Sequence, residues 1–300
     1  MYVITGATGN TGSVVAEELL ARSEKVRVVG RSAEKLERFV QKGAEAFIGD
    51  VTDTEAMTRA FTGARAVYAM IPPDYTSPNP RADQAKTAEA LGTALERAGV
   101  RYAVCLSSVG ASLAEGTGPV RGLHGFEERM KRVPGLNALV LRPGYFMENL
   151  LSYIGLIRSM SMIAGTLKGD LPIGMIATRD VGVRAAEELR KLDFTGAPVL
   201  ELVGPRDVTL NETAKVIGQG IGKPGLSYSK VPGMMVRAAM TQMGFSPTVA
   251  DLMLEMFDAM NDGRMRALEP RTAQNTTPTT LEQFVADIFV PAYQGKAAGA

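Results

Sequence analysis

Three glycines near the N-terminus have the spacing of a phosphate-binding turn. Gly6, Gly9 and Gly12 lie in GATGNTG, between the apolar run YVIT and the helical pattern GSVVAEELLAR. Glycine there lets the backbone turn tightly, leaves room for a pyrophosphate and allows close packing of helix on strand. The free N–H groups at the helix N-terminus then attract the anion. Because the motif lies at the first strand-to-helix connection, it predicts a dinucleotide site that also includes Thr8, Asn10 and Thr11.

The end of the second expected strand indicates which dinucleotide binds. A site for NAD places Asp or Glu there to bind the ribose 2′-hydroxyl, whereas this chain has Arg31 and Ser32, with Lys35 one turn later. A 2′-phosphate would meet cations, and a planar guanidinium is suited to grip it while stacking on the adenine. The alternative is a solvated Arg/Lys pair at a helix start. We therefore predict NADP(H) in preference to NAD(H).

Further cofactor contacts are expected where the third and fourth strands end. Asp50 and Val51 follow the third strand, and the Asp50 carboxylate offers an acceptor to the adenine amino group. Met70, Ile71 and Pro72 end the fourth strand, where apolar backbone passes beside the ribose in folds of this type. These residues complete the cofactor site predicted from the first strands.

The elements that must position these residues alternate along the first half of the chain. Short β-type runs and longer helical patterns predict βαβ units and six parallel strands by residue 142. After RPGYFMENL, Gly and Pro interrupt the alternation, which indicates a second lobe. There we expect a helix at 180–191, a strand at 199–203, a helix at 210–220, a strand in LSYSKV and a frayed tail from Gln294.

Composition excludes several classes of protein. The 33 Lys and Arg balance 32 Asp and Glu, with no basic stripe, so nucleic-acid binding is not expected. No apolar run approaches membrane-spanning length and no signal peptide precedes the first strand, so we expect a soluble, cytoplasmic protein. A single Cys, Cys105, lies in an apolar run, where we expect a buried thiol. One His and one Cys leave no usual zinc site, and no metal is predicted.

Methionines concentrate in two helical segments separated by Ser246-Pro247. Eight of the sixteen fall between Met234 and Met265. Flexible thioethers suit an adaptable apolar surface, such as a substrate lid or a docking face for a protein partner or a second copy of the chain. The alternative is that they fill a core or a helix–helix contact. The pattern alone leaves both interpretations open.

With GATGNTG, VVGRS, GDVTD, LSSVGA and LRPGYFMENL placed in order, the chain resembles the NmrA-like family of atypical short-chain dehydrogenases/reductases. The match covers residues 1–205 and is looser beyond. The resemblance implies an α/β fold, a Rossmann-type doubly wound parallel sheet with a smaller, mainly helical C-terminal lobe. It divides the chain into an NADP(H)-binding core, 1–150, and a substrate lobe, 151–300, of which 174–205 returns to pack on the core.

The chain departs from the acid–base pattern of active short-chain dehydrogenases. These use Ser with Tyr-x-x-x-Lys, in which Tyr passes the proton to or from the substrate oxygen. The serine position survives here as Ser107 or Ser108, but Leu123 stands where the lysine would be and Pro119 near the tyrosine position. A ketone needs a positioned acid, whereas a quinone forms a stabilised hydroquinone anion and an iminium is already cationic. The missing pair therefore favours such acceptors.

Two side chains are candidates for the acid. His124 is one, because an imidazole is the usual proton carrier near neutral pH, although a lone His at a helix start is more often structural. Tyr145 follows the sixth strand, close to where the nicotinamide lies in the family, and with Pro143 and Phe146 it would wall the ring. The alternative for Tyr145 is that its ring only packs beneath the cofactor. Glu148 and Asn149 are expected to cap or hydrogen-bond the chain.

Two functions from different classes follow. The first is an NADPH-dependent oxidoreductase that transfers hydride directly to a small, flat, apolar or aromatic acceptor such as a quinone. The second is a regulator whose NADP(H) occupancy alters a partner-binding face on the C-terminal lobe. The missing acid–base pair fits both.

Overall fold

The computed structural model describes residues 1–296, and a parallel sheet forms its centre. Seven strands lie in the order β10-β6-β5-β4-β1-β2-β3, and each neighbouring pair is parallel. The strand order reverses between β1 and β4, where sheets of this kind bind ligands beyond the carboxyl ends of the strands. The strands are β1 (Tyr2–Ile4), β2 (Val26–Gly30), β3 (Glu45–Ile48), β4 (Ala66–Ala69), β5 (Tyr102–Leu106), β6 (Asn137–Pro143) and β10 (Val199–Leu202).

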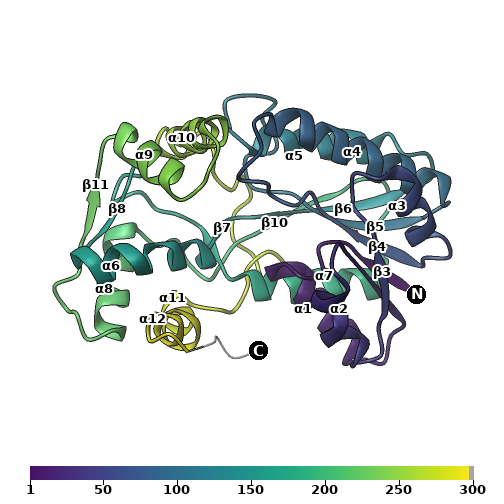
Figure 1. The fold of residues 1–300 in the computed structure, drawn as a ribbon, viewed down its shortest axis with the longest axis horizontal. Helices are drawn as coiled ribbons and strands as arrows, with labels where there is room; N and C mark the ends of the chain where they lie inside the picture. Colours follow the sequence, from purple (N-terminus) through teal and green to yellow (C-terminus); the bar gives the residue numbers. More distant parts are fainter. Residues whose placement is uncertain (297–300) are drawn as a thin grey trace.

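Helices cover both faces of this sheet (Figure 1). One face carries α1 (Asn10–Leu20), α2 (Ala33–Val40) and α7 (Thr178–Lys191), and the other carries α3 (Thr54–Phe61), α4 (Pro80–Arg97) and α5 (Val120–Lys131). Alternate residues of a strand enter opposite clusters: Ile4 and Val28 pack under α1, while Val3 and Val29 pack under α3 and α4. Apolar strands buried on both faces are typical of parallel sheets. The predicted doubly wound α/β fold is confirmed.

The chain leaves the core after β6 and returns to it. Residues 174–205 supply β9 (Met175–Ile176), α7 and β10, and β10 pairs with β6 from Val199↔Val140 to Leu202↔Pro143. Helix α7 approaches α1 closely, since a Cβ on Gly182 would lie 2.5 Å from Val14 Cβ. This return fixes the outer edge of the sheet beside β6.

The C-terminal lobe packs around its own apolar cluster, which includes Leu150, Ile163, Ile217 and Phe284. Two short parallel pairs, β7 with β9 and β8 with β11, brace it. Its helices lie on the left of Figure 1, and α9 and α10 extend toward the loop before α5. The elements are β7 (Tyr145–Phe146), η1 (Met147–Tyr153), α6 (Ile154–Met160), β8 (Ile163–Gly165), α8 (Leu210–Gly220), β11 (Tyr228–Lys230), α9 (Gly233–Gln242), α10 (Pro247–Asn261), α11 (Leu281–Phe284), η2 (Val285–Phe289) and α12 (Val290–Tyr293).

Two details differ from the sequence-based expectations. The strand expected in LSYSKV is limited to Tyr228–Lys230, because it pairs only with the three residues of β8. The tail does not fray at Gln294, since Gln294 N donates to Val290 O at 3.0 Å and Lys296 N donates to Pro291 O at 2.9 Å. The rest of the predicted frayed tail, residues 297–300, lies outside the described residues.

Cys105 lies in the middle of the sheet, fully buried as expected. Burial, with a smaller effect from Glu127, raises the pKa of its thiol to about 12. The thiol is therefore neutral at physiological pH and packs as an apolar group. Within residues 1–296, no helix is long and apolar enough to cross a membrane. The same residues contain no cluster of three or more His, Cys, Asp or Glu side chains arranged to hold a metal ion.

Candidate dinucleotide and substrate cleft

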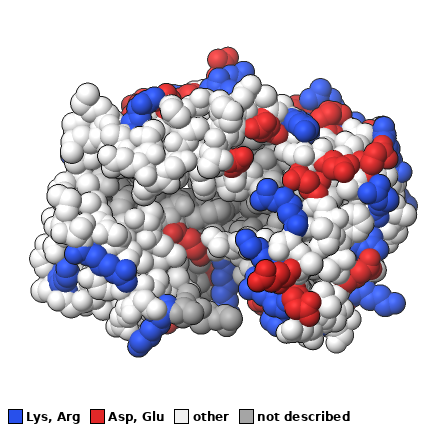
Figure 2. All heavy atoms as spheres, in the orientation of Figure 1, with Lys and Arg blue, Asp and Glu red and all other residues white. Residues whose placement is uncertain are grey.

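A large cleft opens at the carboxyl ends of the strands, between the sheet and the C-terminal lobe. Its volume is about 1690 Å³, and Figure 2 shows the molecule hollowed between the lobe on the left and the core on the right. A site for one small ligand occupies roughly 300–1,000 Å³, so this cleft has room for a dinucleotide and a second molecule. Predicted cofactor residues that line it are Gly6, Thr8, Gly9, Arg31, Asp50, Val51, Met70, Ile71, Pro72, Ser107, Ser108, Pro143, Tyr145 and Phe146.

The glycine loop forms a cradle that side chains would fill. Gly6 has φ +64°, a conformation that L-residues rarely adopt, and a Cβ there would lie 2.6 Å from Met70 Sδ. Gly9 precedes the first residue of α1, and no side chain caps the helix. A Cβ on Gly12 would lie 2.3 Å from Gly6 O, so helix and loop are in backbone contact. The N–H groups at a helix N-terminus beside such a cradle fit a pyrophosphate.

Several predicted cofactor residues do not line the cleft. Thr11 is buried, and its Oγ1 accepts a hydrogen bond from Tyr68 OH at 2.9 Å. Ser32 caps α2, where its Oγ accepts from Lys35 N at 3.5 Å. Gly12, Asn10 and Lys35 also do not contribute to the cleft lining. Gly12 acts through packing, and Asn10 begins the helix whose N-cap residue, Gly9, lines the cleft.

A cation that the sequence did not reveal joins Arg31 in the lining of the cleft. Lys86, from α4, lines the cleft with Arg31 and Asp50. Hydrogen bonds from Thr52, first from its backbone N–H, lower the pKa of Asp50, and Arg31 and Lys86 also favour its charged form. Arg31 and Lys86 thus act on one carboxylate, from two elements far apart in sequence. Only the fold brings them together.

Helix α10 forms an apolar wall of the cleft opposite the sheet. Its lining residues are Val249, Leu252, Met253, Met256 and Met260, followed by Met265. In contrast, Met234, Met235 and Met243 of the α9 region are exposed. Met240 of α9 and Met260 of α10 are buried, as the packing interpretation expects. The methionines therefore divide among packed, cleft-lining and exposed positions. Thioethers and aliphatic groups along one wall fit a flat apolar molecule.

The wall near Ser107 is apolar where an acid–base pair would stand. Pro119, Val120 and Leu123 all line the cleft. The position is therefore accessible to a ligand, but it offers no proton donor. Glu148, expected to hydrogen-bond the chain, accepts from Thr178 N at 3.0 Å and from Thr178 Oγ1 at 2.6 Å, and so anchors the start of α7.

Tyr145 begins β7 and lines the cleft beside Phe146. Its backbone N–H donates to Gly174 O at 3.0 Å, which fixes the strand. Burial raises the pKa of Tyr145 well above its ordinary value, and the neighbouring phenols of Tyr153 and Tyr228 raise it further. The phenol is therefore protonated at neutral pH and weak as an acid.

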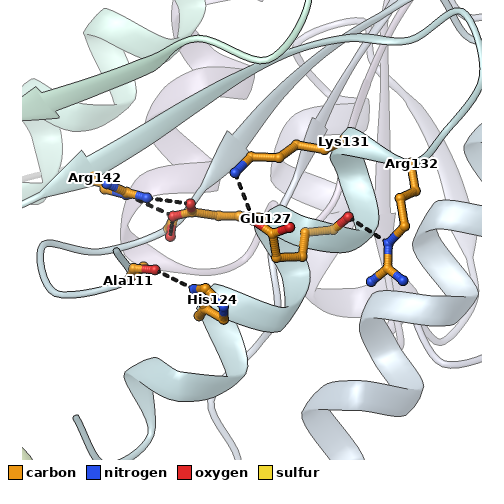
Figure 3. A network of polar contacts seen from close by, with 8 residues as sticks. Ala111, His124, Glu127, Lys131, Arg132 and Arg142 are labelled. Atoms are coloured by element: carbon orange, nitrogen blue, oxygen red, sulfur yellow. Dashed lines mark hydrogen bonds and ion pairs between the residues drawn. The ribbon is translucent and has the colours of Figure 1, made fainter. Parts of the chain in front are cut away.

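His124 lies in α5, and its ring does not line the cleft. Its Nδ1 is 2.9 Å from Ala111 O, which ties the loop after β5 to the helix (Figure 3). We expect His124→Ala to change the turnover rate by less than about 2-fold, while the lost hydrogen bond lowers stability by about 1 kcal/mol. Steady-state kinetics and urea denaturation measure the two effects. A fall in the turnover rate of about 100-fold or more, the usual cost of losing a general acid, would show that His124 is the general acid.

A buried ion pair lies behind Ser107. Arg142 Nε and Nη2 donate to Glu127 Oε1 and Oε2 at 2.9 and 2.6 Å, and Ser107 Oγ is 2.5 Å from Glu127 Oε1. Figure 3 shows Glu127 and Arg142 facing each other from α5 and β6. The hydrogen bonds with Glu127 raise the pKa of Arg142. The one signal in the sequence is a charged residue inside the apolar run ALVLRP, which requires a partner when buried.

Comparisons with known proteins agree with this geometry. Residues 6–154 match the family model described as NAD(P)H-binding. The NAD(P)H azoreductase of Xenophilus azovorans is 27% identical over 257 residues, which are 86% of this chain and 86% of the relative. The (4-alkanoyl-5-oxo-2,5-dihydrofuran-3-yl)methyl phosphate reductase of Streptomyces griseus subsp. griseus is 28% identical over 284 residues, which are 95% of each chain.

A solved structure shares the whole fold. The NADPH-dependent quinone oxidoreductase of Escherichia coli, in complex with NADPH, superposes with a TM-score of 0.82 at 22% identity, over 96% of this chain and 100% of the other. The family model and the two relatives bear out the family resemblance and the predicted class of NAD(P)H-binding oxidoreductase, and the solved structure bears out the fold. The regulatory alternative gains no support from the two curated relatives, since both are named as reductases.

Proposed function

We propose that this NAD(P)H-binding oxidoreductase, an NmrA-like protein, reduces a flat, apolar aromatic acceptor, most simply a quinone, with NADPH as the preferred cofactor. When bound, NADPH supplies the hydride. The chain's own residues hold the dinucleotide on the glycine cradle and place the acceptor between the nicotinamide and the α10 wall. Names of similar proteins support acceptors of this class, a quinone in one case and an azo compound in another.

The observation that carries the proposal is the apolar wall at the position of the missing acid–base pair. Pro119 and Leu123 face the cleft there, and the α10 wall continues with Leu252 and Met256. A ketone reduced at such a wall would leave an unstabilised alkoxide. A quinone would not, because its reduced anion is delocalised over an aromatic ring. The cleft therefore suits acceptors that need positioning more than proton transfer.

The test is a steady-state assay of NADPH oxidation with small quinones, azo dyes and simple ketones. We expect turnover with quinones, weaker or comparable turnover with azo dyes and none above background with ketones. Turnover limited to ketones would overturn the proposed acceptor class while leaving the cofactor assignment intact.

The 2′-phosphate is the feature by which Arg31 would select NADPH. We expect Arg31→Ala to weaken NADPH binding by roughly 10- to 100-fold, as for losing a charge-assisted hydrogen bond, and NADH binding by less than about 3-fold. Lys86→Ala should act in the same direction, whereas Lys35→Ala should act less because Lys35 lies off the cleft. Fluorescence titration measures the affinity of each variant for both cofactors. Arg38→Ala, an exposed residue of α2, is the control, and equal losses for NADPH and NADH would contradict the role.

Tyr145 is expected to act as part of the cleft wall and not as the proton donor. Burial raises the pKa of its phenol well above its ordinary value, far from the neutral range in which a general acid works best. We therefore expect Tyr145→Phe to lower the turnover rate with a quinone by less than about 10-fold, and the rate to show no limb from this phenol between about pH 6 and 9. A pH–rate profile of both proteins tests this. A loss of about 100-fold or more, the usual cost of removing a general acid, would make Tyr145 the proton donor.

A further inference from the structure

The proton of a serine hydroxyl at the end of β5 is held by a buried carboxylate. Ser107 Oγ is 2.5 Å from Glu127 Oε1, and both oxygens of Glu127 accept hydrogen bonds from Arg142. A guanidinium is always charged and offers only donors. The carboxyl group that accepts its two N–H groups is therefore a carboxylate, and the hydrogen in the short contact comes from Ser107.

Burial keeps this arrangement in place. Ser107 is 4% exposed, and the side chains of Glu127 and Arg142 are 1% and 11% exposed. At a site so shielded from solvent, a hydrogen bond to a charged group is costly to break. Ser107 nevertheless lines the cleft, and no group within residues 1–296 donates a hydrogen bond to its Oγ. The hydroxyl thus presents lone pairs, and not its proton, to the cleft.

The position of Ser107 indicates which part of the cofactor it meets. Strand β5 lies on the far side of β4 from β1, whereas β2, which carries Arg31 at its end, lies on the other side of β1. Arg31 belongs to the adenosine end in the proposed function, so Ser107 belongs to the nicotinamide end. The carboxamide N–H2 is the one hydrogen-bond donor of a nicotinamide ring. An acceptor-only side chain selects that group.

We propose that Glu127 is a positioning residue that fixes Ser107 as a hydrogen-bond acceptor for the nicotinamide carboxamide, and that Ser107 does not protonate the acceptor. The proposal rests on the proposed function, since it requires a nicotinamide in this half of the cleft. It gives the surviving serine a role different from that of a proton donor. Anchoring the carboxamide also limits rotation of the nicotinamide ring. Hydride transfer requires this ring to be held in one orientation.

The experiment compares two oxidised cofactors without any acceptor, so that no turnover occurs. NADP+ carries the carboxamide, and 3-acetylpyridine adenine dinucleotide phosphate carries a methyl ketone without the N–H2 group. Calorimetry gives the dissociation constant of each. We expect the wild-type protein to bind NADP+ about 5- to 10-fold more tightly, as for one hydrogen bond, and Ser107→Ala to bring the ratio of the two constants to about 1.

A second variant tests Glu127 itself. The double substitution Glu127→Met with Arg142→Leu replaces the ion pair by apolar groups, a change that buried pairs often tolerate. It frees the Ser107 hydroxyl to donate to the carbonyl oxygen that both cofactors share, so the ratio should again fall toward 1. Ser152→Ala, an exposed serine outside the cleft, should keep the wild-type ratio.

The outcomes separate the two proposals. A ratio that Ser107→Ala leaves unchanged would overturn the role of Ser107, even when both cofactors bind normally. An unchanged ratio in a folded double variant would overturn the role of Glu127. If neither cofactor bound to the wild-type protein, the proposed function itself would fail. Circular dichroism establishes that each variant is folded, and Ser107→Ala decides the carboxamide contact whether or not the double variant folds.

Discussion

Gly12→Ala is expected to lower kcat/KM for NADPH by about 100-fold, the order of loss that a displacement of about 1 Å produces in a positioned site. A Cβ on residue 12 would lie 2.3 Å from Gly6 O and 2.7 Å from Gly6 C. Both are backbone atoms of the loop, so no side chain can move aside to relieve the clash. Helix α1 and the loop must separate, and the N–H groups at the helix start then no longer point toward the expected position of the pyrophosphate. Steady-state kinetics with NADPH as the varied substrate measures the loss.

Gly125→Ala is the matched control. Gly125 is also a helical glycine, in α5, but a Cβ there would meet nothing within 4 Å. Alanine should therefore stabilise the helix by roughly 0.5–1 kcal/mol and leave the NADPH kinetics unchanged. If Gly12→Ala kept wild-type affinity for NADPH while Gly125→Ala behaved as expected, the glycine cradle would not be the pyrophosphate site.

Glu127→Ala is expected to lower the free energy of unfolding by about 3–5 kcal/mol, the cost of leaving a buried charge without its partner. Arg142 loses both hydrogen bonds, and Ser107 loses its acceptor. Glu201 attracts Arg142, but its carboxylate already accepts from the backbone N–H groups of Leu268 and Glu269. Urea denaturation followed by circular dichroism measures the change.

The neighbouring residue supplies the control for this loss. Glu128 pairs with Lys131 at 2.7 Å, with exposed fractions of 44% and 40% for the two side chains. Exposed pairs contribute at most about 1 kcal/mol, so Glu128→Ala should be nearly neutral. Losses of equal size at the two positions would show that the buried Glu127–Arg142 pair contributes no more to stability than an exposed pair.

The parts of the site carried by local sequence could be predicted. The glycine loop and Arg31 lie within one strand-to-helix connection each, so their spacing already determines their neighbours. Lys86 could not be placed at the cleft in the same way, because it joins Arg31 only through the packing of α4 on the sheet. Ser32 shows the converse: its side chain caps α2, a local role that competes with cofactor binding.

The fold shows the same division. Strands such as β2 and β6 are mostly apolar runs that favour the interior of a parallel sheet, and the sequence predicts them. The lobe pairs β7 with β9 and β8 with β11 contain two or three residues each, too few to show a period. Their pairing depends on tertiary contacts alone. The Glu127–Arg142 pair also depends on tertiary contacts, since its members lie fifteen positions apart on different elements. The sequence alone therefore did not predict it.

In the proposed function, the cleft brings a nicotinamide and a flat acceptor together for direct hydride transfer. The most direct test is a single-turnover experiment, in which protein loaded with NADPH is mixed with a quinone and the decay of bound NADPH is followed. Deuterium is placed in turn at each of the two C4 positions. We expect acceptor-dependent decay that is slower for one deuterated position only. Tight NADPH binding with no acceptor-dependent decay for any quinone or azo dye would contradict it.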